Sequence, residues 1–430
     1  MTITSSKLSL KKYVLSIPGA RFVLLGISGI AYGASFTWCW FLFWLMVPAF
    51  VALGWLFVDK RMSFGEAFWW GACAFAPRVF GVFSALVRSL GMSWWLTLGA
   101  STLFSAYLVV QVALVITAGA WLAQHGKRFF RLITFFGVLF LMHWWLVSGL
   151  FWVFGAFEGD ATSHPLVPWF CGCAGRLVGT RGVPQHILRF AVVRLPFKPL
   201  ATVCEVEHLD FLSRSIAQLA VEKPEVSVIL LPESSLPYCL NTHSSSMAAL
   251  SLLSERKALV FSGHRQEGDS VSSCCYFFNG GQLSSWCEKY HLMFFVERAP
   301  ALFGLPLPCS IGHLIGIDDF FVPGKRERVP FVVSGLSGEP VSLLYPLICS
   351  ELFMTNQIAS VPSTNCAAVA LVNDAWFAGS AQPDLMFGLA LLKAWWYQKD
   401  LFYVGYRYAT YICGRGLRRS AHLAVYSDLR

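Results

Sequence analysis

The chain has 430 residues, of which 56% are hydrophobic and 13% are charged, and its formal net charge is +9. Charged residues make up about a quarter of a typical soluble domain. The composition therefore excludes a disordered chain and argues against an ordinary soluble enzyme. The apolar excess is uneven, because residues 13–157 carry few charges whereas residues 186–430 have a near-normal mixture. The sequence predicts a membrane anchor (1–158), a linker (159–185) and one α/β domain (186–430).

The N-terminal part contains apolar stretches of the length that a helix needs to cross a bilayer, which is about 20 residues. There are five, at residues 14–34, 37–58, 64–87, 93–123 and 130–154. We therefore expect an α-helical anchor of five transmembrane spans.

Basic residues gather in the loops that these spans would place on one side of the membrane. They are Lys7, Lys11, Lys12, Lys60, Arg61, Lys127 and Arg128. The positive-inside rule puts that side in the cytoplasm. Five crossings then place the α/β domain in the periplasm of a Gram-negative host, with the chain in the inner membrane. The same rule explains the net charge, and without a dense Lys/Arg run we expect no direct contact with nucleic acid.

The chain has 13 cysteines, but none of them form the CxxC pair typical of a metal site. We interpret most of them as small buried hydrophobic residues, and we expect neither a metal nor a cofactor.

From about residue 186, short apolar runs alternate with amphipathic segments. The pattern predicts strands at 187–195, 226–231, 258–262, 274–278, 341–347, 367–372 and 402–406, and helices at 208–222 and 385–398. Such alternation is typical of an α/β sandwich. Residues 299–340 are rich in Pro and Gly and read as a long loop, of the kind that often forms a lid or a binding surface.

Three reactive side chains fall where predicted strands end or shortly after one. Glu233 follows the strand at 226–231, Cys349 follows the strand at 341–347, and Lys289 lies in a short polar segment. Sheet enzymes present catalytic groups at strand ends. Together the three suit acyl transfer: the thiolate attacks a carbonyl, the carboxylate moves protons and the ammonium stabilises the oxyanion. The charge of Lys289 should also lower the pKa of Cys349.

Each of these residues alone has an ordinary structural explanation. A cysteine at the end of an apolar strand is usually part of the core, a glutamate after proline is usually a solvated turn, and a single lysine indicates little. The constellation gains its meaning from the flanking sequence.

Five segments, in order, carry a resemblance to a known family. They are Leu231-Pro232-Glu233 with Leu236-Pro237, Lys289-Tyr290-His291-Leu292, Glu297, Ile348-Cys349-Ser350-Glu351, and Asn373-Asp374-Ala375-Trp376-Phe377. The sequence resembles the nitrilase (carbon–nitrogen hydrolase) superfamily and, more narrowly, its apolipoprotein N-acyltransferase branch. The resemblance covers most of residues 20–414. It implies a nitrilase-type αββα sandwich, shortened at its C-terminus relative to the family.

The resemblance also implies roles for these residues. Glu233, Lys289 and Cys349 would be catalytic, and Glu297 and Glu351 would support them. Asn373, Asp374 and Trp376 would line the substrate site. The implied reaction is ping-pong: an acyl chain from a phospholipid forms a thioester on Cys349, and an amine, such as the N-terminus of a lipoprotein, then accepts it.

Two departures from the family pattern leave the substrate open. Residues 293–297 read Met-Phe-Phe-Val-Glu instead of Val-Pro-Phe-Gly-Glu, and Ser350 replaces an aromatic residue. The divergent chain is also similar to TraB-type conjugal-transfer proteins, which implies an accessory role in plasmid transfer. Two alternatives stay open: an amide hydrolase that uses the same three residues, and a non-catalytic membrane component of a conjugal-transfer or envelope complex.

Overall fold

The structure is a computed structural model of the chain. It describes residues 19–34, 45–59, 62–76, 93–124, 126–144, 180–181, 189–195, 204–292, 297, 301–302, 305–306, 321–324, 328–333, 342–353, 355–362, 365–377, 382–414 and 418–427.

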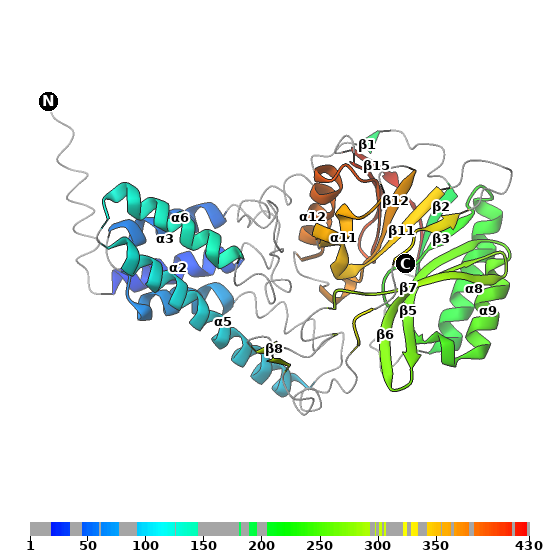
Figure 1. Ribbon diagram of the computed structural model, residues 1–430, viewed down its shortest axis with the longest axis horizontal. Helices are drawn as coiled ribbons and strands as arrows, with labels where there is room; N and C mark the ends of the chain where they lie inside the picture. The colour runs from blue at the N-terminus through cyan, green and yellow to red at the C-terminus, as the bar shows by residue number, and fades with distance from the viewer. Residues whose placement is uncertain are drawn as a thin grey trace.

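The N-terminal part is helical, and its helices pack on one another at the blue and cyan end of the molecule (Figure 1). They are α2 (Ala20–Ala34), α3 (Met46–Asp59), a helical stretch over 64–76, α5 (Trp94–Ala123) and α6 (Arg128–Trp144). Polar contacts join them as well as apolar packing. Arg21 pairs with Glu66 across 2.7 Å, and Trp70 donates a hydrogen bond to the Ser28 hydroxyl at 3.1 Å.

The prediction of five transmembrane spans is wrong. Within the residues that the structure describes, no helix combines the length and the apolar character needed to cross a membrane. Helices α2, α3 and α6 have 15, 14 and 17 residues, short of the roughly 20 that a crossing needs. Polar side chains such as Ser101 and Gln111 recur along α5. The periplasmic orientation rested on those crossings and loses its support.

Several parts of those predictions fall outside the described residues. They are 14–18, 37–44, 77–87 and 145–154 of the predicted spans, most of the linker 159–185, and the basic residues Lys7, Lys11, Lys12, Lys60 and Arg61.

The C-terminal part contains two large sheets. The first sheet has the order β1-β15-β14-β13-β12-β11-β10, and the second has the order β16-β2-β3-β5-β6-β7, with β4 paired to β5. The strands of the first sheet are β1 (Thr180–Arg181), β10 (Phe331–Val333), β11 (Ser342–Ile348), β12 (Cys366–Leu371), β13 (Leu401–Val404), β14 (Ala409–Cys413) and β15 (Arg418–His422). Those of the second are β2 (Phe190–Arg194), β3 (Val228–Leu230), β4 (Leu236–Cys239), β5 (Ala258–Glu267), β6 (Ser270–Asn279), β7 (Gln282–Glu288) and β16 (Ala424–Ser427). A small pair, β8 (Ala301–Leu302) and β9 (Leu305–Pro306), lies in the segment predicted as a long loop.

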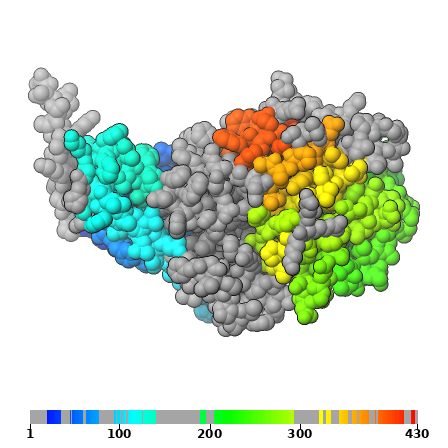
Figure 2. All heavy atoms as spheres, in the orientation of Figure 1, coloured from blue at the N-terminus to red at the C-terminus, as the bar shows by residue number. Residues whose placement is uncertain are grey.

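Helices cover the outer face of each sheet. α11 (Thr355–Ala359) and α12 (Gln382–Trp396) belong to the first sheet, and α8 (Glu205–Glu222) and α9 (Ser244–Ser254) to the second (Figure 1). One apolar core lies between the sheets and includes Leu230, Ile348 and Leu371. In the space-filling view, green atoms of the second sheet lie directly against yellow and orange atoms of the first (Figure 2). The predicted αββα sandwich is confirmed.

Strand direction brings the reactive segments to one end of the sandwich. β11, β12 and β13 run parallel in the first sheet, and β2, β3 and β5 run parallel in the second. Carboxyl ends of parallel strands lie at the same edge of a sheet. Glu233 therefore lies at the carboxyl ends of the strands of one sheet, and Cys349 and Asn373 lie at the carboxyl ends of the strands of the other.

The antiparallel strand β7 delivers the lysine to this edge. A two-residue turn, Gly280-Gly281, joins β6 to β7, and both residues have positive φ (58° and 81°). Such turns suit glycine, because a side chain would strain that backbone. β7 then runs back along β6 and ends at Glu288, directly before Lys289.

Candidate active site

Four predicted site residues meet in one buried group, which we call the lysine cluster: Glu233, Lys289, Glu297 and Cys349. The Lys289 ammonium lies 2.8 Å from Glu233 Oε1 and 2.7 Å from Glu297 Oε1. The four residues are between 1% and 8% exposed. Burial alone would lower the pKa of Lys289, but the charges of Glu233 and Glu297 outweigh it and hold that pKa well above its ordinary value. Lys289 is thus a fixed cation.

A tight turn after β3 aims Glu233 at this group. Ser234 adopts a φ of 58°, which is unusual for a residue other than glycine, and its amide donates to the Ser262 hydroxyl at 2.8 Å. The Ser235 hydroxyl closes the turn by donating to the Pro232 carbonyl at 2.6 Å. Strained backbone of this kind persists only where surrounding contacts hold it, and it is common at functional sites.

Cys349 also lies in a strained turn, with a φ of 44°, directly after β11. Burial raises the pKa of its thiol well above the ordinary value, and the nearby charge of Glu233 raises it further, whereas Lys289 opposes the rise. The prediction that Lys289 lowers the pKa of Cys349 is therefore right in direction for that pair but wrong for the net shift. The negative charge of Glu233 acts directly on the thiol, so a carboxylate able to accept its proton lies nearby.

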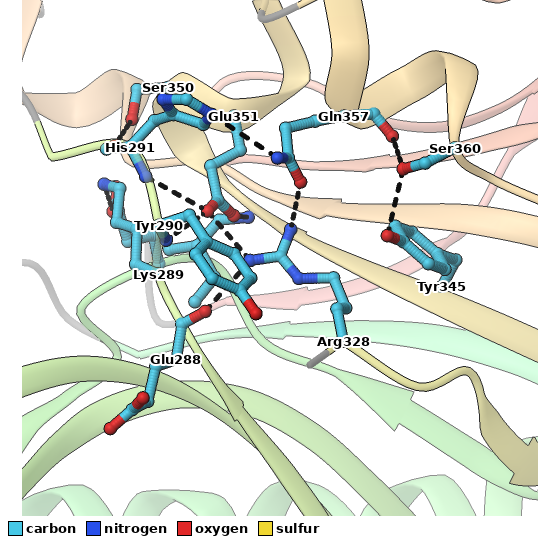
Figure 3. Close-up of polar contacts among 12 residues, drawn as sticks. Glu288, Lys289, Tyr290, His291, Arg328, Tyr345, Ser350, Glu351, Gln357 and Ser360 are labelled. Carbon is cyan, nitrogen blue, oxygen red and sulfur yellow. Dashed lines mark hydrogen bonds and ion pairs between the residues drawn. The ribbon is translucent and has the colours of Figure 1, made fainter. Parts of the chain in front are cut away.

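Glu351 forms the centre of a second buried group, which we call the glutamate clamp (Figure 3). Its Oε1 accepts from the Tyr290 amide at 2.6 Å and from Arg328 at 2.8 Å, and its Oε2 accepts from the Ile348 amide at 2.9 Å. Glu351 is fully buried. One carboxylate thus holds the residue before Cys349 and the residue after Lys289 in a fixed relation.

Neighbouring contacts reinforce this link. Ser350 donates to the His291 carbonyl at 2.6 Å, and Arg328 donates to the Glu288 carbonyl at 3.0 Å and to Gln357 at 3.3 Å. The serine that replaces the family's aromatic residue is therefore itself a bridge between the nucleophile turn and the lysine segment.

The third predicted segment follows β12. Asn373 and Asp374 are 3% and 1% exposed. Asp374 Oδ1 accepts from the amides of Tyr406 and Arg407, at 2.6 and 3.0 Å, and so caps the turn between β13 and β14. Burial raises the pKa of Asp374 to about 6, although those backbone hydrogen bonds lower it. Trp376 belongs to the turn Asp374–Phe377, but its side chain lies outside the description.

Sequence reasoning missed two residues near the lysine cluster and the clamp. Arg328 lies in the segment that the sequence predicts only as a long loop, yet it makes the ion pair with Glu351. His264, on β5, packs its ring 4.7 Å from that of Phe321. Burial lowers the pKa of His264 to about 4, and the charge of Lys289 adds to the lowering. The only sequence signal was a polar residue within a largely apolar strand.

Among the described residues, no group of three or more His, Cys, Asp or Glu side chains could hold a metal ion. Lysine has three N–H donors, and within the described part of the chain two of those of Lys289 are used by carboxylates. The third has no acceptor among the residues that the structure describes.

Comparisons with known proteins confirm the resemblance inferred from the sequence. No family model matches the chain. It is similar to the apolipoprotein N-acyltransferase of Allorhizobium ampelinum, with 24% identity over 240 residues, or 52% of this chain and 44% of that protein. It is also similar to the protein of the same name from Brucella suis, with 26% identity over 40% of this chain and 32% of that protein. The chain thus matches less than half the length of these relatives.

The chain also resembles solved structures, at lower sequence identity. Nit3 of Saccharomyces cerevisiae, a nitrilase superfamily member, matches 49% of this chain and 78% of its own with 13% identity and a TM-score of 0.36. A carbon–nitrogen hydrolase from Helicobacter pylori matches 50% of this chain and 72% of its own with 11% identity and a TM-score of 0.35. These TM-scores are low, so the assignment of the fold is based on the strand order described above and not on these structures.

Proposed function

We propose that the chain is an acyl-transfer enzyme that carries an acyl group as a thioester on Cys349 and passes it to an amine. The observation that carries this proposal is the lysine cluster, in which a buried thiol, a carboxylate and the lysine cation paired with it converge from two sheets. The similarity to apolipoprotein N-acyltransferases supports an acyl chain as the group that moves.

The first half-reaction acylates the thiol. Glu233 takes the proton from Cys349 as Sγ attacks the carbonyl carbon of an ester, and Lys289 stabilises the resulting oxyanion. When the tetrahedral intermediate collapses, the ester C–O bond breaks and the proton on Glu233 passes to the leaving alkoxide. An alcohol leaves, and the thioester stays on Cys349.

The second half-reaction returns the enzyme to its starting state. A neutral amine attacks the thioester carbonyl, Glu233 accepts one amine proton, and the C–S bond breaks. The proton then returns to the sulfur, so an amide and the free thiol result. The Glu297 carboxylate places a second negative charge beside the Lys289 ammonium, which therefore stays protonated throughout the reaction.

The partners in this proposal are a phospholipid as acyl donor and a lipoprotein or other amine as acceptor. Large apolar side chains exposed on the N-terminal helices support contact with lipid, for example Phe22, Ile27, Val51, Leu114 and Phe129. A location at the bacterial inner membrane belongs to the same proposal. The accessory role in plasmid transfer is a further prediction of the sequence, and the names of the relatives above give it no support.

The test is intact-protein mass spectrometry of the purified full chain after incubation with phospholipid vesicles of one defined acyl chain. We expect a mass increase of one acyl group that hydroxylamine removes and that Cys349→Ala abolishes. Cys366→Ala is the matched control, because that half-buried cysteine lies on the adjacent strand β12 and should leave the adduct intact. Folded protein without an adduct would defeat the proposal. Free fatty acid released without transfer to an added peptide amine would instead assign hydrolysis.

A further inference from the structure

The side chain of Asn373 is buried without any hydrogen bond in the part of the chain that the structure describes. The residue is 3% exposed, and both Oδ1 and Nδ2 lack a partner. Leaving a buried amide unpaired is unfavourable, and native proteins contain few such groups. An unpaired donor and an unpaired acceptor on one side chain point to a ligand that supplies the complementary pair.

The sheet places this amide beside the nucleophile. β11 and β12 are parallel neighbours with Ile348 paired to Leu371, so Cys349 and Asn373 directly follow the ends of adjacent strands. Neighbouring strands are about 4.8 Å apart.

The alternation of side chains along β12 also gives the direction. Val369 and Leu371 lie in the core between the two sheets, whereas Ala370 and Val372 lie in the core under the helices. Side chains alternate faces along a strand. Asn373 lies two residues beyond Leu371, so this alternation, extended past the end of β12, assigns it to the side of the first sheet that faces the second sheet.

The chemistry of an amide then selects among the substrates. Asn offers N–H donors and one carbonyl acceptor in a single plane. The ester groups of a phospholipid contain acceptors only, so they would leave Oδ1 unpaired. A peptide bond contains both an N–H and a C=O, and it can satisfy both halves of the asparagine amide.

We propose that Asn373 forms an amide-recognition subsite beside Cys349, which holds a peptide bond of the acceptor and not the ester of the acyl donor. The proposal rests on the proposed function, in which the acceptor is the second substrate and attacks the thioester. The binding itself requires no acyl transfer, and so it can be tested without the reaction.

The experiment uses the full chain with Cys349→Ala, which cannot be acylated. Binding of an acetyl-blocked tripeptide amide is measured by ligand-observed NMR titration. It is compared with the matched depsipeptide, in which an ester oxygen replaces each backbone N–H. The same titrations are run with Asn373→Leu added, and with Asn373→Ala in case the leucine variant does not fold.

We expect the tripeptide to bind about tenfold more tightly than the depsipeptide, as the loss of one buried hydrogen bond implies. Substitution of Asn373 removes both hydrogen bonds, so it should weaken tripeptide binding by more than about tenfold and remove the difference between the ligands. Thermal unfolding separates a binding role from a structural one. Asn373→Leu should leave the melting temperature unchanged or raise it, because an unpaired amide disappears, whereas a structural role predicts a lower melting temperature.

Three results would overturn the subsite: no tripeptide binding, equal binding of the two ligands by the parent, or full binding by the Asn373 variants. A lower melting temperature with intact binding would likewise assign the amide a structural role. Failure of the proposed function looks different, since it is the absence of an acyl adduct on intact Cys349 while tripeptide binding persists.

Discussion

The lysine cluster and the glutamate clamp are both buried ionic groups, but their hydrogen-bonding groups are satisfied to different degrees. In the clamp, the Glu351 carboxylate accepts from Arg328 and from the amides of Tyr290 and Ile348. In the lysine cluster, one cation serves two carboxylates, its third N–H has no acceptor among the described residues, and burial raises the pKa of the Cys349 thiol. The first arrangement leaves nothing to react, whereas the second leaves a proton acceptor, a nucleophile and a donor.

This contrast explains why the site needs both groups. The strained turns at Ser234 and Cys349 hold the reactive side chains in positions that the local backbone does not favour. Glu351 links the backbone on either side of the reacting atoms, so its contacts stabilise that geometry without taking part in the chemistry. A stable clamp and an incomplete cluster together form a preorganised site.

The largest effect on stability should come from breaking the clamp. Glu351→Ala leaves the Arg328 guanidinium buried without its carboxylate, and losing one member of a buried ion pair typically costs about 3–5 kcal/mol. Chemical denaturation of the full chain measures the change in the free energy of unfolding.

Two further variants show whether charge is the cause. Glu351→Gln keeps an acceptor for the Tyr290 and Ile348 amides and should cost less than alanine. Combining Glu351→Ala with Arg328→Met removes the stranded charge and should recover part of the loss. A single alanine variant as stable as the parent would show that the clamp does not hold the site.

The next effect concerns rate. Lys289→Met removes the cation between two carboxylates and the donor that meets the oxyanion, and losing such a donor typically costs 100- to 1000-fold, or about 3–4 kcal/mol. The measurement is the rate of acyl-adduct formation by mass spectrometry. Lys257→Met is the matched control, because Lys257 is also buried but donates to the Val226 carbonyl. Equal rates in parent and Lys289→Met would remove Lys289 from the mechanism.

Asp374 should give a smaller, pH-dependent effect. Burial raises its folded-state pKa to about 6 from 3.8, so the folded state binds a proton more tightly than the unfolded state does. Its contribution is therefore fully present below pH 4 and falls as the pH rises to about 6, by up to roughly 3 kcal/mol. Asp374→Asn should remove that slope from a plot of unfolding free energy against pH. An unchanged slope would mean that other groups cause it.

The sequence predicted much of this site because its residues follow apolar runs that form strands. The strands before Glu233 and Cys349 were placed within two residues, and parallel strands bring their ends together without further information. The partner of Glu351 was not predictable, because Arg328 lies 23 residues earlier in a loop and no local pattern pairs them. The transmembrane spans were wrong because a hydropathy count does not separate apolar residues that pack on other helices from those that meet lipid. Leu53, Leu56 and Phe57 of α3 are all buried within the protein.

The smallest effect should come from an ion pair that lacks burial altogether. Asp210 and Arg214 lie one turn apart on α8, 3.0 Å from each other, with side chains 62% and 71% exposed. Water and salt screen such pairs, so Asp210→Ala should change the free energy of unfolding by only about 0.3–0.5 kcal/mol, and less in high salt. A double-mutant cycle with Arg214→Ala isolates the pair energy, and the same cycle on Glu351 and Arg328 should give a far larger value that salt barely alters. We expect burial and the backbone donors to make the clamp stronger than an exposed ion pair. Comparable energies for the two pairs would contradict that expectation.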